Sequence, residues 1–206
     1  TFRDPAEILA ELKGGGGAHA AHAMDHSQMD HSKMKPAGDA AAAPMANMLN
    51  DIVYDAYLAN DRTLDDPQVV AVERNGQVRL RVINGAAASN MWIDLGKLEG
   101  ELIAVDGNAI FPLRGSVFPL AIAQRADVRL KIPSEGGAFP ILFRPEGVGQ
   151  RTGIVLATAG AKIARVAGDG DVAPALDVSF ERRLRAVAEL PQEPVSRTEM
   201  LMLTGG

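Results

Sequence analysis

A series of short apolar segments, each bounded by turn residues, runs through about 110 residues of this chain and constrains its fold more than any other feature. In residues 78–82 apolar and charged residues alternate strictly, as in a strand with one buried face. Asn75-Gly76, just before, is a typical two-residue hairpin turn. No helical pattern lies between the segments, so we expect an all-β antiparallel sandwich or barrel. The predicted strands are residues 53–58, 69–72, 78–82, 91–95, 102–105, 117–123, 128–132, 139–143 and 154–157.

The segments on either side of this β region have a different texture. Asp4, Pro5 and Glu7 are typical of a helix N-terminus and Gly14 of a helix end, so a short helix that needs a docking surface is expected here. Ala, Gly, Met, His and Asp dominate the stretch that follows, which indicates a flexible loop. The predicted parts are residues 1–17, a helix and Gly linker from a preceding domain; 18–50, a Met/His-rich flexible loop; 51–160, the β domain; and 161–206, a linker that wraps this domain and leads to a following one.

Composition and charge exclude several functional classes. The net charge of −5 leaves no basic excess for binding nucleic acid or an anionic membrane surface. No apolar run approaches the ~18–20 residues that span a bilayer, and the first residues do not form a signal peptide. Cysteine is absent, which excludes disulfides, thiolate metal sites and cysteine nucleophiles.

One short motif predicts a metal site. Residues 24–28 (Met-Asp-His-Ser-Gln) are followed at once by residues 29–33 (Met-Asp-His-Ser-Lys), and all four histidines lie in residues 19–31. Thioethers favour Cu(I), and imidazole suits both Cu(I) and Cu(II). A repeat of five does not align on one helix face, so the ligands would converge only if the loop folded around the ion. The alternative is a spacer in which Met and His recur by chance. The candidate copper ligands are His19, His22, Met24, His26, Met29, His31 and Met34.

Motifs of other enzyme classes do not occur in the sequence: it contains no GxSxG, Walker A or HExxH pattern. The basic cluster Arg182, Arg183 and Arg185 could bind an anion, but its acidic neighbours favour a solvated charged surface. Trp92 lies at a position that we expect to face the core, where it would pack instead of contacting a substrate.

Several of these segments together resemble the second cupredoxin domain of three-domain multicopper oxidases. The resemblance begins with residues 54–60 (Tyr-Asp-Ala-Tyr-Leu-Ala-Asn), where Asp61 replaces the glycine of the family pattern, and continues with residues 79–84 (Arg-Leu-Arg-Val-Ile-Asn). The later stretches that match in order are residues 104–107, 120–128, 153–156 and, as the entry to a third domain, 201–205. The Met-Asp-His-Ser repeat is similar to the Met-rich tracts of bacterial copper-resistance, laccase-like members of the family.

This resemblance implies a Greek-key cupredoxin-like β-sandwich that is the middle domain of a periplasmic copper enzyme. Such enzymes couple oxidation of Cu(I) or phenolic substrates to the reduction of O2 to water. Their type 1 copper ligands lie in the third domain, and the first and third domains share the ligands of the trinuclear copper cluster. These two domains are therefore the implied partners of this one.

The sequence departs from the complete enzyme in its copper ligands. It has neither the cysteine of a type 1 site nor a His-x-His pair, so no catalytic or cofactor-binding residue carries over. We expect this chain alone to be inactive, with copper ions bound only by the Met/His loop, and to self-associate through apolar surface that neighbouring domains would cover. A free-standing copper-binding or storage module and an inert structural domain are the alternatives.

Overall fold

The computed structural model describes residues 3–13, 54–188, 190–191 and 193–202. The helical elements are α1 (Pro5–Lys13) and the 3-10 helix η4 (Glu181–Arg183). The strands are β1 (Val69–Ala71), β2 (Gln77–Ile83), β3 (Met91–Asp94), β4 (Gly100–Val105), β5 (Asn108–Gly115), β6 (Val117–Leu120), β7 (Arg125–Lys131), β8 (Ala138–Pro145) and β9 (Thr152–Ala157).

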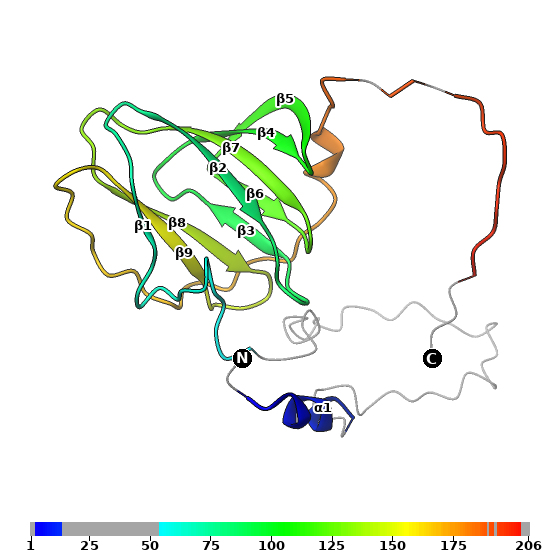
Figure 1. The fold of residues 1–206 in the computed structure, drawn as a ribbon, viewed down its shortest axis with the longest axis horizontal. Helices are drawn as coiled ribbons and strands as arrows, with labels where there is room; N and C mark the ends of the chain where they lie inside the picture. Colours follow the sequence, from blue (N-terminus) through cyan, green and yellow to red (C-terminus); the bar gives the residue numbers. More distant parts are fainter. Residues whose placement is uncertain (1–2, 14–53, 189, 192, 203–206) are drawn as a thin grey trace, which may run out of the picture.

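The strands form two sheets that enclose a shared core (Figure 1). One has five strands in the order β1-β9-β8-β3-β6, and the other has four in the order β2-β7-β4-β5. Ile93 and Leu156 of the first sheet and Val128 of the second are almost fully buried in this core. The predicted all-β sandwich is therefore confirmed. One pairing departs from the antiparallel expectation, because β1 runs parallel to β9.

The turn at Asn75-Gly76 does not make the predicted hairpin. The turn itself forms, with Asn75 at φ 56° and the Gly76 amide donating to the Glu73 carbonyl at 3.1 Å. The flanking strands nevertheless belong to different sheets, β1 pairing with β9 and β2 with β7. A tight turn fixes the local reversal of the chain but not the sheet that each arm joins, so here it connects the two sheets.

Two strand predictions were wrong. Residues 54–58 do not form a strand; instead the next residues turn back on themselves, with Asn60 and Asp61 at positive φ inside a bridge between Ala59 and Arg62. Strand β5 was missed because residues 108–115 do not alternate between apolar and polar residues and contain Pro112. Its pairing with β4 is also irregular, with a register shift between Leu102 and Ala104. The Asp106-Gly107 turn that leads into β5 was expected and is present.

Helix α1 begins as predicted. The Asp4 carboxylate accepts a hydrogen bond from the Ala6 amide at 2.8 Å, which satisfies one of the free N–H groups of the first turn. Arg3, just before the helix, forms an ion pair with Asp55 at 3.6 Å, so the helix start is tied to the segment that enters the sandwich.

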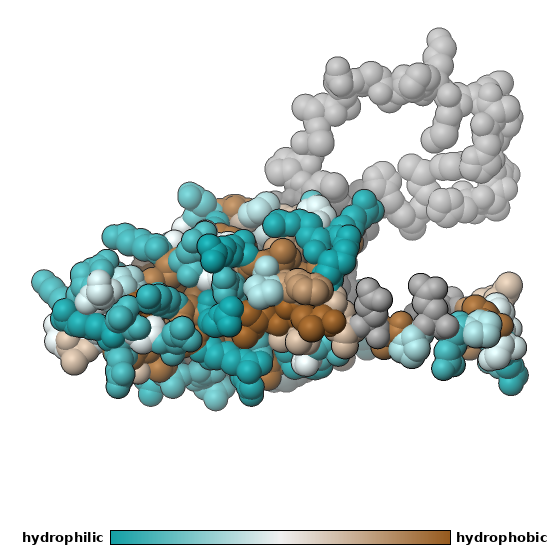
Figure 2. Space-filling model, turned by 90° about the horizontal axis from the view of Figure 1, so that it is seen from above, coloured by the Kyte–Doolittle hydropathy of each residue, from teal (hydrophilic) through white to brown (hydrophobic). Residues whose placement is uncertain are grey.

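After β9 the chain contacts the sandwich as far as residue 187. Ala173 bridges Glu146, the Trp92 indole donates to the Pro174 carbonyl at 2.8 Å, and Ala186 bridges Ile110 of β5. The chain thus crosses the outer face of the five-stranded sheet and then lines the edge of the four-stranded one. In the view from above, hydrophilic side chains cover most of the described surface around a smaller apolar area (Figure 2).

Candidate functional site

The predicted copper ligands, His19, His22, Met24, His26, Met29, His31 and Met34, lie outside the described residues. In the part of the chain that the structure describes, no group of three or more His, Cys, Asp and Glu side chains could hold a metal ion. The described residues therefore supply no cluster of His, Cys, Asp and Glu ligands for copper. None of the described helices is long and apolar enough to span a membrane.

A cavity of about 670 Å³ lies beside the segment that enters the sandwich. Tyr54, Tyr57, Met91, Leu120 and Phe143 supply much of its apolar wall. Tyr57 is buried; its hydroxyl lies 3.1 Å from the Ser89 hydroxyl oxygen. Burial, partly offset by that hydrogen bond, raises the pKa of Tyr57 above its ordinary value, so the phenol stays protonated at neutral pH. It can donate a hydrogen bond there but cannot serve as a base.

Asn84, the last residue of the Arg-Leu-Arg-Val-Ile-Asn motif, also lines this cavity. Its amide nitrogen donates to the Ser89 carbonyl at 2.9 Å and to the Leu120 carbonyl at 3.1 Å, and its oxygen accepts from the Ala86 amide at 3.0 Å. Asn84 is buried, so each of these bonds satisfies a group that water cannot reach. The motif's asparagine is thus a structural residue that fixes the loop between β2 and β3.

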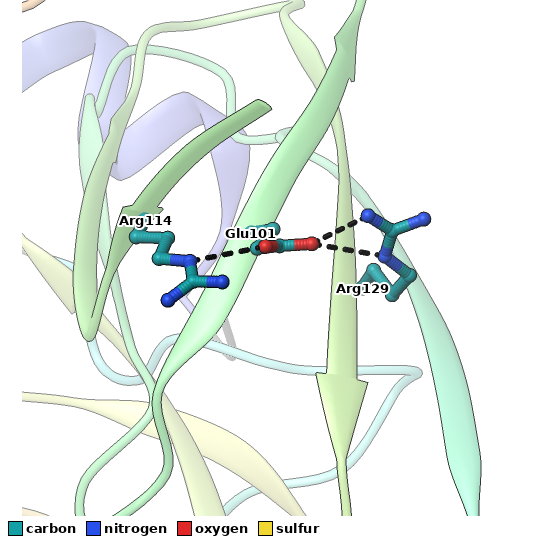
Figure 3. Close-up of polar contacts among 3 residues, drawn as sticks. All are labelled: Glu101, Arg114 and Arg129. Atoms are coloured by element: carbon teal, nitrogen blue, oxygen red, sulfur yellow. Dashed lines mark hydrogen bonds and ion pairs between the residues drawn. The ribbon is translucent and has the colours of Figure 1, made fainter. Parts of the chain in front are cut away.

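A second polar cluster lies on the outer face of the four-stranded sheet (Figure 3). Glu101 of β4 lies directly between Arg114 of β5 and Arg129 of β7 in the strand register. Arg114 Nε donates to one carboxylate oxygen at 3.1 Å, and Arg129 donates to the other through Nε at 3.1 Å and Nη2 at 2.5 Å. Arg129, followed by Arg114, lowers the pKa of Glu101. Sequence reasoning missed this cluster, because only the register of three strands brings the residues together.

Two other predictions can be compared with the structure. The prediction that Trp92 faces the core was wrong: Ile93 points into the core, and Trp92 lies on the other face of β3, only partly buried and hydrogen bonded to the chain at Pro174. The arginines of the basic cluster are exposed, as expected of a solvated surface. Arg183 lies over the Phe180 ring at 5.5 Å, and Arg185 donates to the carbonyls of Arg182 and Leu184.

Comparison with known proteins identifies the family. Residues 21–168, well over half of the chain, match the model of the multicopper oxidases. The chain belongs to the multicopper oxidase family. The family implies copper as the cofactor of the parent enzyme, although no cluster of His, Cys, Asp and Glu among the described residues could hold the metal.

Individual relatives are similar to this chain over part of their length. The multicopper oxidase MmcO of Mycobacterium tuberculosis is 29% identical over 97 residues, which are 47% of this chain and 19% of that protein. This chain thus spans about a fifth of the length of that relative. The crystal structure of Fet3p, a multicopper oxidase that functions in iron import, superposes with a TM-score of 0.50 at 13% identity, over 62% of this chain and 26% of that one. This likeness confirms the cupredoxin-like fold. The blue copper oxidase from Nitrosomonas europaea has 18% identity and a TM-score of 0.45, over 52% of this chain and 35% of that one.

Proposed function

We propose that this chain is the non-catalytic middle cupredoxin domain of a periplasmic multicopper oxidase. The complete enzyme would couple oxidation of Cu(I) or phenolic substrates to reduction of O2 to water, and the domains before and after this one would supply its copper ligands. The observation that carries the proposal is a family match across residues 21–168 in a sequence without cysteine, the thiolate that a type 1 copper requires. The domain parts proposed above, with the sandwich at residues 51–160, follow from the same reasoning.

The test is an oxidase assay of the 206-residue chain after incubation with copper. We expect no oxygen consumption with Cu(I) or a phenol, and full activity from a protein in which this chain is linked to the two flanking domains. Turnover by the chain alone would contradict the non-catalytic role.

We also propose that the Met/His tract binds copper. A Cu(I) titration against a chromophoric competitor, under reductant, compares the chain with a variant in which Met24, Met29, Met34, His26 and His31 are all alanine. Tight binding that the variant loses would support a copper tract of the copper-resistance type. Equal, weak binding by both proteins would mean that the tract is a spacer.

A free-standing copper-storage module remains the second candidate, favoured by the placement of every histidine in one tract. Linked flanking sequence distinguishes the two, because only an oxidase would carry His-x-His and cysteine motifs there.

Self-association is a further part of the proposal. Leu190 is 88% exposed and Met200 90% exposed in the last described residues, which leaves apolar surface for another domain or copy to cover. Sedimentation should show oligomers at micromolar concentration, and a monomer throughout would contradict this expectation.

A further inference from the structure

The outer face of the four-stranded sheet carries a charge opposite to that of the chain. Within β2, β4, β5 and β7 the cationic side chains outnumber the carboxylates by six to two, whereas the net charge of the chain is −5. The carboxylates are Glu101 and Asp127. The cations are Arg79, Arg81, Arg114, Arg125, Arg129 and Lys131. We call these residues the cationic face.

Glu101 and Asp127 do not neutralise this face, because each is already shared between two arginines: Glu101 between Arg114 and Arg129, and Asp127 between Arg79 and Arg81. A third carboxylate, Asp106 in the turn between β4 and β5, lies 3.7 Å from Arg125, so three carboxylates pair with five of the six cations. A guanidinium has five N–H donors, so each shared arginine keeps donors for other groups. In addition, Arg79 lies directly opposite Arg129 in the register, a like-charge pair that is unfavourable for sheet pairing. Ion pairs within the fold thus involve five of the six cations, but three carboxylates do not balance the charge of six cations.

Exposed apolar side chains accompany these cations on the same sheet. Ile83 at the end of β2 is 69% exposed and Phe111 of β5 is 60% exposed. Arginine combined with exposed aromatic and aliphatic residues is the composition of protein–protein contact surfaces. A surface that binds only phosphates or sulfates would not need the apolar residues.

We propose that the cationic face is a docking surface for a separate protein that presents an acidic patch, a role beyond that of a bridging domain. The exposed apolar side chains of Ile83 and Phe111 favour a protein partner over nucleic acid or an anionic membrane. Four strands ~4.8 Å apart and about seven residues long span roughly 20 by 20 Å, about half of a standard interface per partner. The contact is therefore transient and sensitive to salt.

The experiment measures binding of labelled poly-L-glutamate to the 206-residue chain at low ionic strength. The test variant is Arg81→Gln/Arg114→Gln/Lys131→Gln, in which Glu101 keeps Arg129 and Asp127 keeps Arg79. The control variant, Lys162→Gln/Arg165→Gln/Arg197→Gln, removes three exposed charges from the chain after β9. Circular dichroism and thermal unfolding establish that both variants are folded. Heparin and phosphatidylglycerol vesicles are the comparison probes.

We expect the test variant to bind poly-L-glutamate about tenfold more weakly than the parent chain and the control variant to bind within about twofold. Equal weakening in both variants would overturn the proposal, because net charge alone would then explain binding. Preference for heparin or for the vesicles, lost in the test variant, would assign the face to a polyanion or a lipid surface and would also overturn it. Neither result affects the proposed place of the domain in an oxidase.

Discussion

The two sheets enclose one core, yet their outer faces differ in chemistry. The strands of the five-stranded sheet contain a single cation, Arg144, and a single acid, Asp94, and every residue of β9 is buried. In β2 and β7 of the four-stranded sheet, buried and exposed residues alternate. Among the described residues, the chain after β9 covers the first sheet, through contacts such as those with Trp92 and Arg144, and leaves the cationic side chains of the second sheet exposed. A sheet covered on both sides needs near-continuous apolar strands, and a sheet covered on one side needs alternation.

The largest test of this difference is a pair of truncations on the outer faces of the two sheets. Val155 of β9 is fully buried although it lies outside the central core cluster, whereas Ile83 of β2 is mostly exposed. We expect Val155→Ala to lower the free energy of unfolding by about 2–3 kcal/mol, from two lost methyl groups and the space they leave. Ile83→Ala should cost under ~1 kcal/mol. Chemical denaturation measures both, and equal costs would contradict the view that only one outer face is covered.

The next test removes a residue that binds the segment after β9 to the five-stranded sheet. Glu146 is 5% exposed. Its carboxylate accepts a hydrogen bond from the Asn90 side-chain amide at 2.6 Å and another from the Leu176 backbone N–H at 2.8 Å. Alanine at this position would leave two donors unsatisfied, so Glu146→Ala should cost about 1–3 kcal/mol and expose residues 173–187 to limited proteolysis.

Glu73→Ala, which removes an exposed carboxylate far from this chain segment in sequence, is the control for Glu146→Ala. Stability and cleavage should match those of the parent chain. If Glu146→Ala were cleaved no faster than this control, the hydrogen bonds of Glu146 would not be what holds the cover on the five-stranded sheet.

The contrast between the sheets shows what the sequence could and could not predict. The alternation in residues 78–82 correctly predicted β2, and the unbroken apolar run at residues 154–157 correctly predicted β9. Which strands pair was not predictable, because a turn such as Asn75-Gly76 has the same local geometry within a hairpin and between sheets. Trp92 was misplaced for a related reason: both faces of β3 are partly covered, so its pattern does not show which face is inside.

The same limit applied to the polar clusters. Glu101, Arg114 and Arg129 are 13 and 15 positions apart along the chain, and only the pairing of β4 with both β5 and β7 makes them neighbours. The Met/His tract, in contrast, is a local repeat that the sequence displays without any fold. Its role as a copper site stays a prediction.

A smaller effect is expected at the turn beside the covered sheet, whose Arg62 carbonyl accepts a hydrogen bond from Thr152 of β9 at 3.3 Å. Asp61 has φ 63°, the left-handed region that glycine adopts at no steric cost, and it replaces the glycine of the resembling family pattern. We therefore expect Asp61→Gly to raise the free energy of unfolding by about 0.5–1 kcal/mol. Asp61→Ala, which loses the carboxylate but keeps Cβ, should not stabilise; if it matched Asp61→Gly, backbone strain would not be the cause.

The most local prediction concerns the open face, where the pKa of Glu101 reports its arginine partners. Arg129 makes two hydrogen bonds to the carboxylate and Arg114 makes one, so Arg129→Gln should raise the pKa of Glu101 toward 4.5 more than Arg114→Gln does.

Because folding lowers the pKa of Glu101, the stabilisation is present above the unfolded-state value and is lost as the pH falls through the folded-state value. The stability difference between the parent chain and Arg129→Gln should therefore be constant near neutral pH and shrink in acid. NMR titration of the Glu101 carboxyl carbon measures the shift, and identical pKa values in both variants would show that the register, with one arginine on each side, matters more than the number of hydrogen bonds.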